Sequence, residues 1–78
     1  MTAPVHAANW WVTVVAQYNQ NKFTGAITNY HAIRSKSIPV AQYSVSTYNK
    51  AAGGGWNYTT FNEYKYYKNT STGQIYGP

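Results

Sequence analysis

The stretch Asn9-Trp-Trp-Val-Thr-Val-Val-Ala-Gln-Tyr18 decides the fold class of this chain. Its apolar side chains recur at every second position, as in a β-strand with one buried face. Val, Thr, Tyr and Trp are also the residue types that favour a pleated surface. The segment therefore predicts a half-buried strand with Trp11 on its second face. The residues predicted to share the buried face are Trp10, Val12, Val14, Ala16 and Tyr18.

The rest of the chain predicts further short strands separated by polar or glycine-rich turns. Residues 1–8 contain Pro4 and show no periodicity, so we expect an N-terminal arm in front of a single β domain at residues 9–78. We find no internal repeat. The predicted fold is all-β: a small antiparallel meander of five or six strands, closed as a barrel or packed as a sandwich. The further strands are expected at residues 23–33, 38–48, 56–67 (one strand or two) and 74–76.

The composition agrees with a small β domain that has a thin core. The chain has 78 residues, no cysteine and no leucine, so neither disulfides nor leucine packing can stabilise it. Aromatic residues reach 18%, with nine Tyr, three Trp and two Phe, and these are left to fill the interior. Charged residues make up only 9%, against about 25% in an average soluble domain. A core this small predicts support from other copies, and hence a homo-oligomer.

Most catalytic chemistry is excluded because the chain has a single acidic side chain, Glu63. Glycosidases normally need two carboxylates, and dedicated Ca²⁺ or Mg²⁺ sites need several. A zinc site could draw only on His6, His31 and Glu63. A metal-free ribonuclease built from His31, Glu63 and Arg34 is the remaining enzymatic alternative, although the strand phases place His31 and Glu63 on different faces. We therefore expect a non-catalytic domain without metal or cofactor.

The residue types that remain suit the binding of neutral glycans. Sugars present apolar C–H faces and many hydroxyl groups, which exposed aromatic rings and neutral Asn, Gln, Ser and Tyr side chains can match. Asn, Gln, Ser and Thr make up a third of the chain. Residues 56–67 hold six aromatic side chains, which cannot all be buried on one face of one strand. For each Trp, burial in the core is the competing expectation. The candidate ligand-binding residues are Trp11, Trp56, Tyr64, Tyr66 and Tyr67.

Two alternative functions use the same residues. In a structural subunit of a virion or surface assembly, the exposed rings would anchor interfaces between neighbouring copies. In a single-stranded nucleic-acid binder, the six basic residues would contact phosphates and the rings would stack on bases. Low charge favours an extracellular, cell-surface or virion location, and no apolar stretch predicts insertion into a membrane. The sequence leaves the ligand and the number of subunits open.

Overall fold

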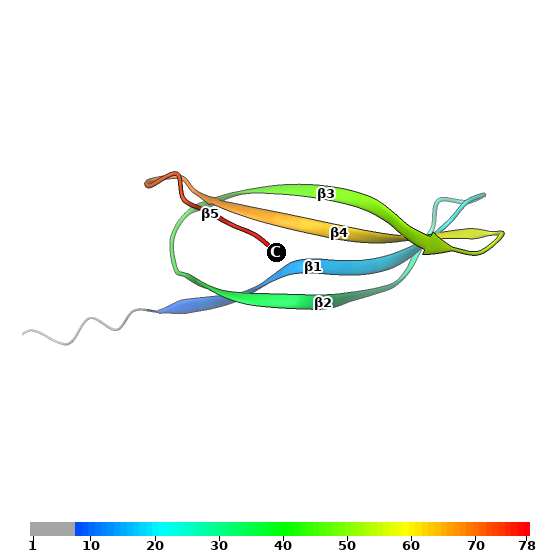
Figure 1. The fold of residues 1–78 in the computed structure, drawn as a ribbon, viewed down its shortest axis with the longest axis horizontal. Coiled ribbons are helices and arrows are strands. Elements are labelled where there is room, and N and C mark those ends of the chain that lie inside the picture. Colours follow the sequence, from blue (N-terminus) through cyan, green and yellow to red (C-terminus); the bar gives the residue numbers. More distant parts are fainter. Residues whose placement is uncertain (1–7) are drawn as a thin grey trace, which may run out of the picture.

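The computed structural model describes residues 8–78, and all of its regular structure is β-strand. The five strands form one antiparallel sheet, whose arrangement can be followed in Figure 1. The all-β, antiparallel prediction is therefore confirmed. Of the predicted arm, residues 1–7 lie outside the described range, and the Ala8 carbonyl accepts a hydrogen bond from Val40 N at 3.0 Å. The strands are β1 (Asn9–Asn21), β2 (Ile27–Pro39), β3 (Tyr43–Gly54), β4 (Tyr58–Asn69) and β5 (Ile75–Tyr76).

The predicted meander and the barrel closure are both wrong, whereas the predicted alternative of a sandwich fits a sheet that stays open. The spatial order is β2-β1-β4-β3, so β2 and β3 follow each other in the chain but lie at opposite edges of the sheet. The sheet does not close, because the edge strands β2 and β3 do not pair with each other. The two central strands, β1 and β4, pair only over Val15–Asn21 and Tyr58–Tyr64. On the N-terminal side of Val15, β1 no longer pairs with β4, and the sheet divides there into two arms (Figure 1). One arm is the β1–β2 hairpin, and the other contains β3, β4 and β5.

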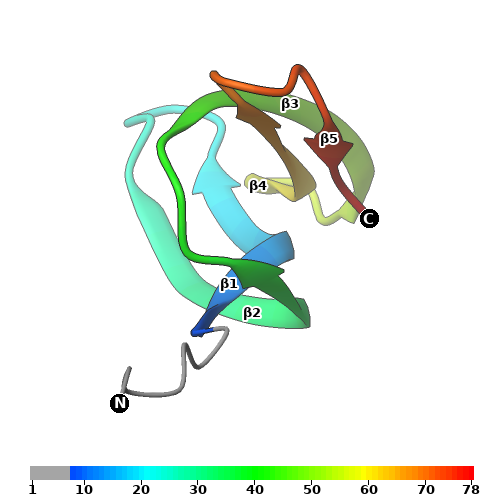
Figure 2. The same ribbon diagram turned by 90° about the vertical axis from the view of Figure 1, so that its left-hand side faces the viewer.

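A three-residue link, residues 40–42, joins the two edge strands at the divided end of the sheet. Four virtual Cα bonds, from Pro39 to Tyr43, reach about 14 Å at most, which is about the width of three strand spacings. If the two arms moved apart within a flat sheet, β2 and β3 would lie farther apart than this link can reach. The sheet is curled instead, and Figure 2 shows the link crossing its end. Lys36 on β2 donates to the Gly77 carbonyl at 2.9 Å, which ties the C-terminal segment to the other arm.

The core is small and is centred on β1. Four of its five buried hydrophobic side chains come from β1, which has neighbours on both sides. Trp11 is 77% exposed, as the alternation predicted, but Trp10 and Trp56 are also exposed, at 47% and 82%. The expectation that the tryptophans fill the core is therefore wrong. The buried residues are Val14, Val15, Ala16, Tyr18 and Ile38.

Neutral polar side chains connect the two central strands. Gln17 on β1 donates to Asn62 on β4 at 3.0 Å. The Thr60 hydroxyl on β4 donates to the Asn19 side chain on β1 at 2.7 Å. Cross-strand pairs of this kind stabilise a sheet without charge. Part of the amide-rich composition therefore serves the fold and not a ligand.

Two hairpins use the same turn, a duplication that the sequence analysis missed. Asn21 and Asn69 each accept backbone N–H groups two and three residues later, at 2.8 and 3.0 Å. Four residues after each Asn stands a glycine with φ of 76°, Gly25 or Gly73, in the left-handed conformation that glycine adopts at no cost. The shared pattern is Asn-X-X-Thr-Gly-X-Ile, at residues 21–27 and 69–75. It fixes the register of β2 on β1 and of β5 on β4.

The single acidic residue of the chain joins β2 to β4. The Tyr30 hydroxyl donates to the Glu63 carboxylate at 2.5 Å, and Lys65 Nζ lies 3.3 Å from the same carboxylate oxygen. This hydrogen bond, with a smaller contribution from burial, raises the pKa of Tyr30 from 10.0 to about 12. The protonated phenol is therefore the form that stabilises the folded sheet.

Alkaline unfolding tests this contact. Because the pKa of Tyr30 is raised on folding, its contribution to stability is complete below pH 10 and is lost as the pH rises towards 12. We expect the denaturation midpoint of the Tyr30→Phe variant to fall less between these pH values than that of the wild type. Tyr48→Phe, on an exposed residue of β3, serves as the control and should follow the wild type. If the denaturation midpoints of the wild type and of Tyr30→Phe fell equally between these pH values, the stabilising role of the Tyr30–Glu63 hydrogen bond would be contradicted.

Candidate ligand pocket

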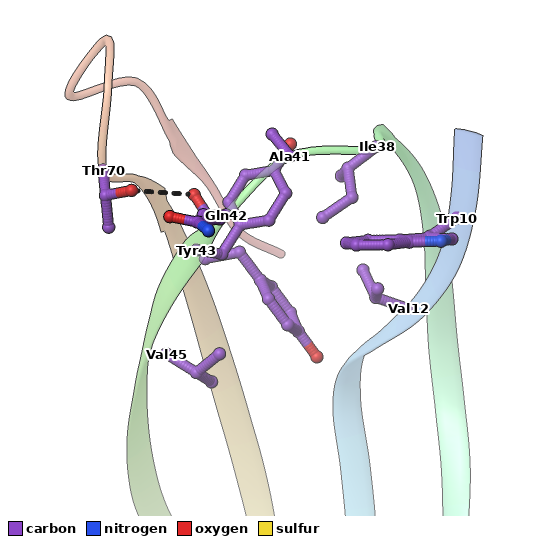
Figure 3. Close-up of a pocket in the computed structure, with 9 residues that line it drawn as sticks. Trp10, Val12, Ile38, Ala41, Gln42, Tyr43, Val45 and Thr70 are labelled. Carbon is purple, nitrogen blue, oxygen red and sulfur yellow. Dashed lines mark hydrogen bonds between the residues drawn. The ribbon is translucent and has the colours of Figure 1, made fainter. Parts of the chain in front are cut away.

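A pocket of about 530 Å³ lies at the divided end of the sheet, between the two arms and below the link. Figure 3 shows Trp10, Val12 and Ile38 facing Tyr43 and Val45 across this space. Its volume is in the range of small-molecule sites. The pocket lies where β1 no longer pairs with β4, on the N-terminal side of Val15; there β5 pairs with the end of β4, and side chains of the two arms face each other across the space. The other lining residues are Ala41, Gln42, Tyr67 and Thr70.

Aromatic rings form two walls of the pocket. The centroids of Trp10 and Tyr43 are 6.5 Å apart, with the ring planes inclined at 59°. Tyr43 also makes edge-to-face contacts with Tyr67 at 6.3 Å and with Tyr76 at 6.0 Å. These contacts fix the orientation of Tyr43, whereas Trp10 is 47% exposed. Tyr43 therefore forms the fixed wall of the pocket, and Trp10 is the more accessible of the two rings.

The three hydroxyl groups of the pocket lining all donate their proton to the backbone. Tyr43 donates to the Pro39 carbonyl at 2.5 Å and Tyr67 to the Thr13 carbonyl at 2.9 Å. Thr70 donates to the Gln42 carbonyl at 3.2 Å (Figure 3). A hydroxyl oxygen that has donated its proton still carries lone pairs. These groups therefore offer acceptors, and the pocket is matched to hydrogen-bond donors on a ligand.

The pocket is also neutral. None of its nine lining residues is Lys, Arg, His, Asp or Glu. Desolvation, together with the neighbouring Tyr76, raises the pKa of Tyr43 above its usual value of 10.0, so its phenol stays protonated at physiological pH. The site thus combines aromatic walls, acceptor oxygens and the absence of formal charge.

The structure separates the five predicted site residues. Only Tyr67 lines the pocket. Trp11 follows Trp10 in β1 and points to the opposite face of the strand. Trp56 lies in the loop between β3 and β4, at the other end of the sheet, where it packs on Phe23 with ring centroids 6.3 Å apart.

Tyr64 and Tyr66 lie on the opposite face of β4 from Tyr67, by the alternation of the strand. Tyr64 stacks on Tyr48 of β3, with a centroid distance of 6.2 Å and ring planes 27° apart. Tyr66 is 40% exposed and lies against Gly77. The two form an aromatic patch on the outer face and do not share a site with Tyr67.

Trp10 and Tyr43 are the pocket residues that the sequence analysis did not select. The alternation of β1 predicted that Trp10 lies in the core. Trp10 does lie on the predicted face of β1, but there it lines the pocket. Tyr43 comes directly after the link, and no sequence pattern indicates which arm it faces. The sequence gives no signal that joins the two residues, because residues 38–48 were predicted as one strand and Trp10 comes near the link only through its pairing with Ile38.

The residues considered for ribonuclease chemistry do not assemble. His31 pairs with Gln17, whereas Glu63 pairs with Ala16, the next residue along β1. The two side chains therefore lie on opposite faces of the sheet. His31 Nδ1 lies 2.8 Å from the Asn29 carbonyl, and Glu63 is bound by Tyr30 and Lys65.

Within residues 8–78, no three His, Asp or Glu side chains lie close enough together to hold a metal ion, and His6 lies outside this range. The same part of the chain contains no helix that is long and apolar enough to cross a membrane. Comparison with protein-family models, curated proteins and solved structures finds no match to the chain. The function is therefore argued from the pocket itself.

Proposed function

We propose that this domain is a non-catalytic binding module that holds a neutral glycan unit in the pocket between its two arms. The observation that carries the proposal is the aromatic lining, in which the hydroxyls of Tyr43, Tyr67 and Thr70 all donate to backbone carbonyls. A sugar ring supplies the complementary features, hydroxyl donors along its edge and apolar C–H groups on its face. Gln42 adds an amide at the rim that both donates and accepts.

The charge of the protein narrows the ligand class. Aromatic walls with acceptor oxygens could also hold an ammonium group, as in aromatic cages. However, the chain carries a net charge of +5, and its one carboxylate, Glu63, is bound by Tyr30 and Lys65 and is absent from the pocket lining. An anionic ligand would find no cation among the lining residues. A neutral, hydroxyl-rich ring is the ligand that fits all of these features.

The test is a titration of tryptophan fluorescence. The double variant Trp11→Phe, Trp56→Phe leaves Trp10 as the single indole of the described chain, so its emission reports the pocket alone. Neutral oligosaccharides, first screened on a glycan array, should shift this emission in a saturable way. The affinity should change little between about 50 and 500 mM NaCl, whereas nucleic-acid binding would weaken steeply over this range. Choline, titrated in parallel, tests the ammonium alternative.

A matched pair of variants gives the second readout. Trp10→Ala removes the ring at the pocket entrance and should weaken binding about tenfold or more, the loss expected for one aromatic contact. Trp11→Ala removes an equally large, more exposed ring from the opposite face and should leave the affinity within about twofold of wild type. Equal losses in both variants, or an array without any binding at high protein concentration, would refute the proposal.

A second candidate function, a subunit of a surface or virion assembly, is favoured by a different observation. Within residues 8–78 only five hydrophobic side chains are buried, and the exposed ones include all three tryptophans. Both edge strands also have a free side in the part of the chain that the structure describes, since each pairs there with a single neighbour. Contacts with neighbouring copies would cover this surface.

A further inference from the structure

Among the described residues, 8–78, the edge strands β2 and β3 differ in how their free sides are protected against pairing with another strand. Edge strands in native proteins commonly carry charges, prolines or bulges that discourage such pairing. β2 has all three: Arg34 and Lys36, Pro39 at its end, and several register shifts against β1. Asn29 adds an irregular backbone with φ of 56°. The β2 edge is therefore a poor template for a further strand.

The β3 edge has none of these features over its first seven residues. Tyr43-Ser-Val-Ser-Thr-Tyr-Asn49 contains no charge and no proline, and it keeps a continuous register with β4 from Tyr43 to Ala51. Its side chains point alternately to the two faces of the sheet, and the segment is rich in the residue types that favour strands. Two large apolar side chains on it, Val45 and Tyr48, are 51% and 57% exposed. This is an unprotected, regular strand edge.

One hydrogen bond shows which amides of β3 are directed outwards. Thr70 N donates to the Gln42 carbonyl at 3.1 Å, so the backbone of Gln42 faces β4. Successive residues in a strand turn their backbone groups to alternate sides. The N–H and C=O groups of the odd-numbered residues therefore point away from β4, at Tyr43, Val45, Thr47 and Asn49.

We propose that β3 pairs with β3 of a second copy in antiparallel orientation, about a two-fold axis at Ser46, and so joins two sheets into one. In this register the outward-facing Val45 lies opposite Thr47 of the other copy, and Tyr43 lies opposite Asn49. Every outward amide of the neutral segment then meets a partner. An edge that pairs with itself makes an isologous contact, which closes as a dimer.

The charge distribution favours a second copy as the occupant. Each chain carries a net charge of +5, so two copies associate only where their cations stay apart. Lys50 is the one charged residue of β3, and the Ser46-centred register places it opposite Gln42 and not opposite the other Lys50. Pairing of β2 with β2 would instead bring Arg34 and Lys36 of both copies together. The neutral β3 edge is thus the one that two cationic chains can share.

Cysteine cross-linking tests both the interface and its register, because the chain contains no cysteine of its own. Ser46 faces its own copy across the axis as a non-hydrogen-bonded pair, for which Cα atoms lie about 4.5 Å apart, within disulfide range. Under mild oxidation of the full chain, Ser46→Cys should form disulfide dimers at least about tenfold faster than Ser44→Cys. In Ser44→Cys the two thiols would be four residues apart along the strand, about 14 Å, which is too far to bridge.

Light scattering of the full chain, over a series of concentrations, gives the independent readout. The wild type should form dimers, and Ser46→Lys, which sets two like charges face to face, should shift it to monomers. Ser35→Lys adds the same charge to the exposed β2 edge and should remain dimeric. Trp10→Ala should also remain dimeric, so that a loss of dimerisation can be distinguished from a loss of glycan binding. A monomer at every concentration, equal cross-linking of the two cysteine variants, or assemblies that persist in folded Ser46→Lys would overturn the proposal.

Discussion

Tyr18→Ala is expected to destabilise the domain by about 3–5 kcal/mol, the cost of deleting a large buried aromatic side chain. Tyr18 is 8% exposed and stacks on two rings, with centroid distances of 6.0 Å to Tyr30 and 5.5 Å to Phe61. Its hydroxyl donates to Asn49 at 3.0 Å. It therefore connects β1 with β2, β4 and β3. In a domain of this size such a loss approaches the whole free energy of unfolding, so the variant should be largely unfolded at room temperature.

Urea denaturation followed by circular dichroism measures this effect, and two variants separate its parts. Tyr18→Phe keeps the ring and loses only the bond to Asn49, so it should cost about 1 kcal/mol. Tyr48→Ala removes a ring that is 57% exposed and should cost about 1 kcal/mol or less. If Tyr18→Ala were as stable as Tyr48→Ala, β1 would not be the centre of the core.

Gly54→Ala is expected to cost about 2–4 kcal/mol because the β3–β4 hairpin has no room for a side chain there. A Cβ at this position would lie 2.5 Å from the Tyr58 carbonyl oxygen and 2.9 Å from Thr59 Cα, both backbone atoms. In addition, φ is 144°, which side-chain-bearing residues rarely adopt. Backbone strain and steric overlap each cost about 1–3 kcal/mol.

The preceding glycine is the matched control for this substitution. A Cβ at Gly53 would have nothing within 4 Å, and its φ lies outside the left-handed range. Gly53→Ala should therefore change the free energy of unfolding by less than about 1 kcal/mol, and restricting the unfolded chain favours a small stabilisation. Equal denaturation midpoints for the two alanine variants would show that the hairpin adapts to a side chain at Gly54.

The strand boundaries show where sequence reasoning failed locally. Residues 34–37 (Arg-Ser-Lys-Ser) have the composition of a turn, and no strand was expected there, yet they lie inside β2. Gly53 and Gly54, assigned to a flexible loop, are the last residues of β3. Both segments belong to edge strands, which are largely exposed. An exposed strand needs no apolar periodicity, so the pattern that identified β1 was absent from them.

The sequence alone determined that the chain forms antiparallel strands and that Val14, Ala16 and Tyr18 of β1 face the interior. These properties follow from residue type and a period of two, which are local. Only the tertiary structure decided that β1 pairs with β4, that the sheet divides at Val15 instead of closing, and that Trp10 and Tyr43 face each other. Strand order depends on contacts between residues far apart in the chain, and alternation along one strand carries no information about its neighbour. The pocket arises from that order, so it became visible only in the folded sheet.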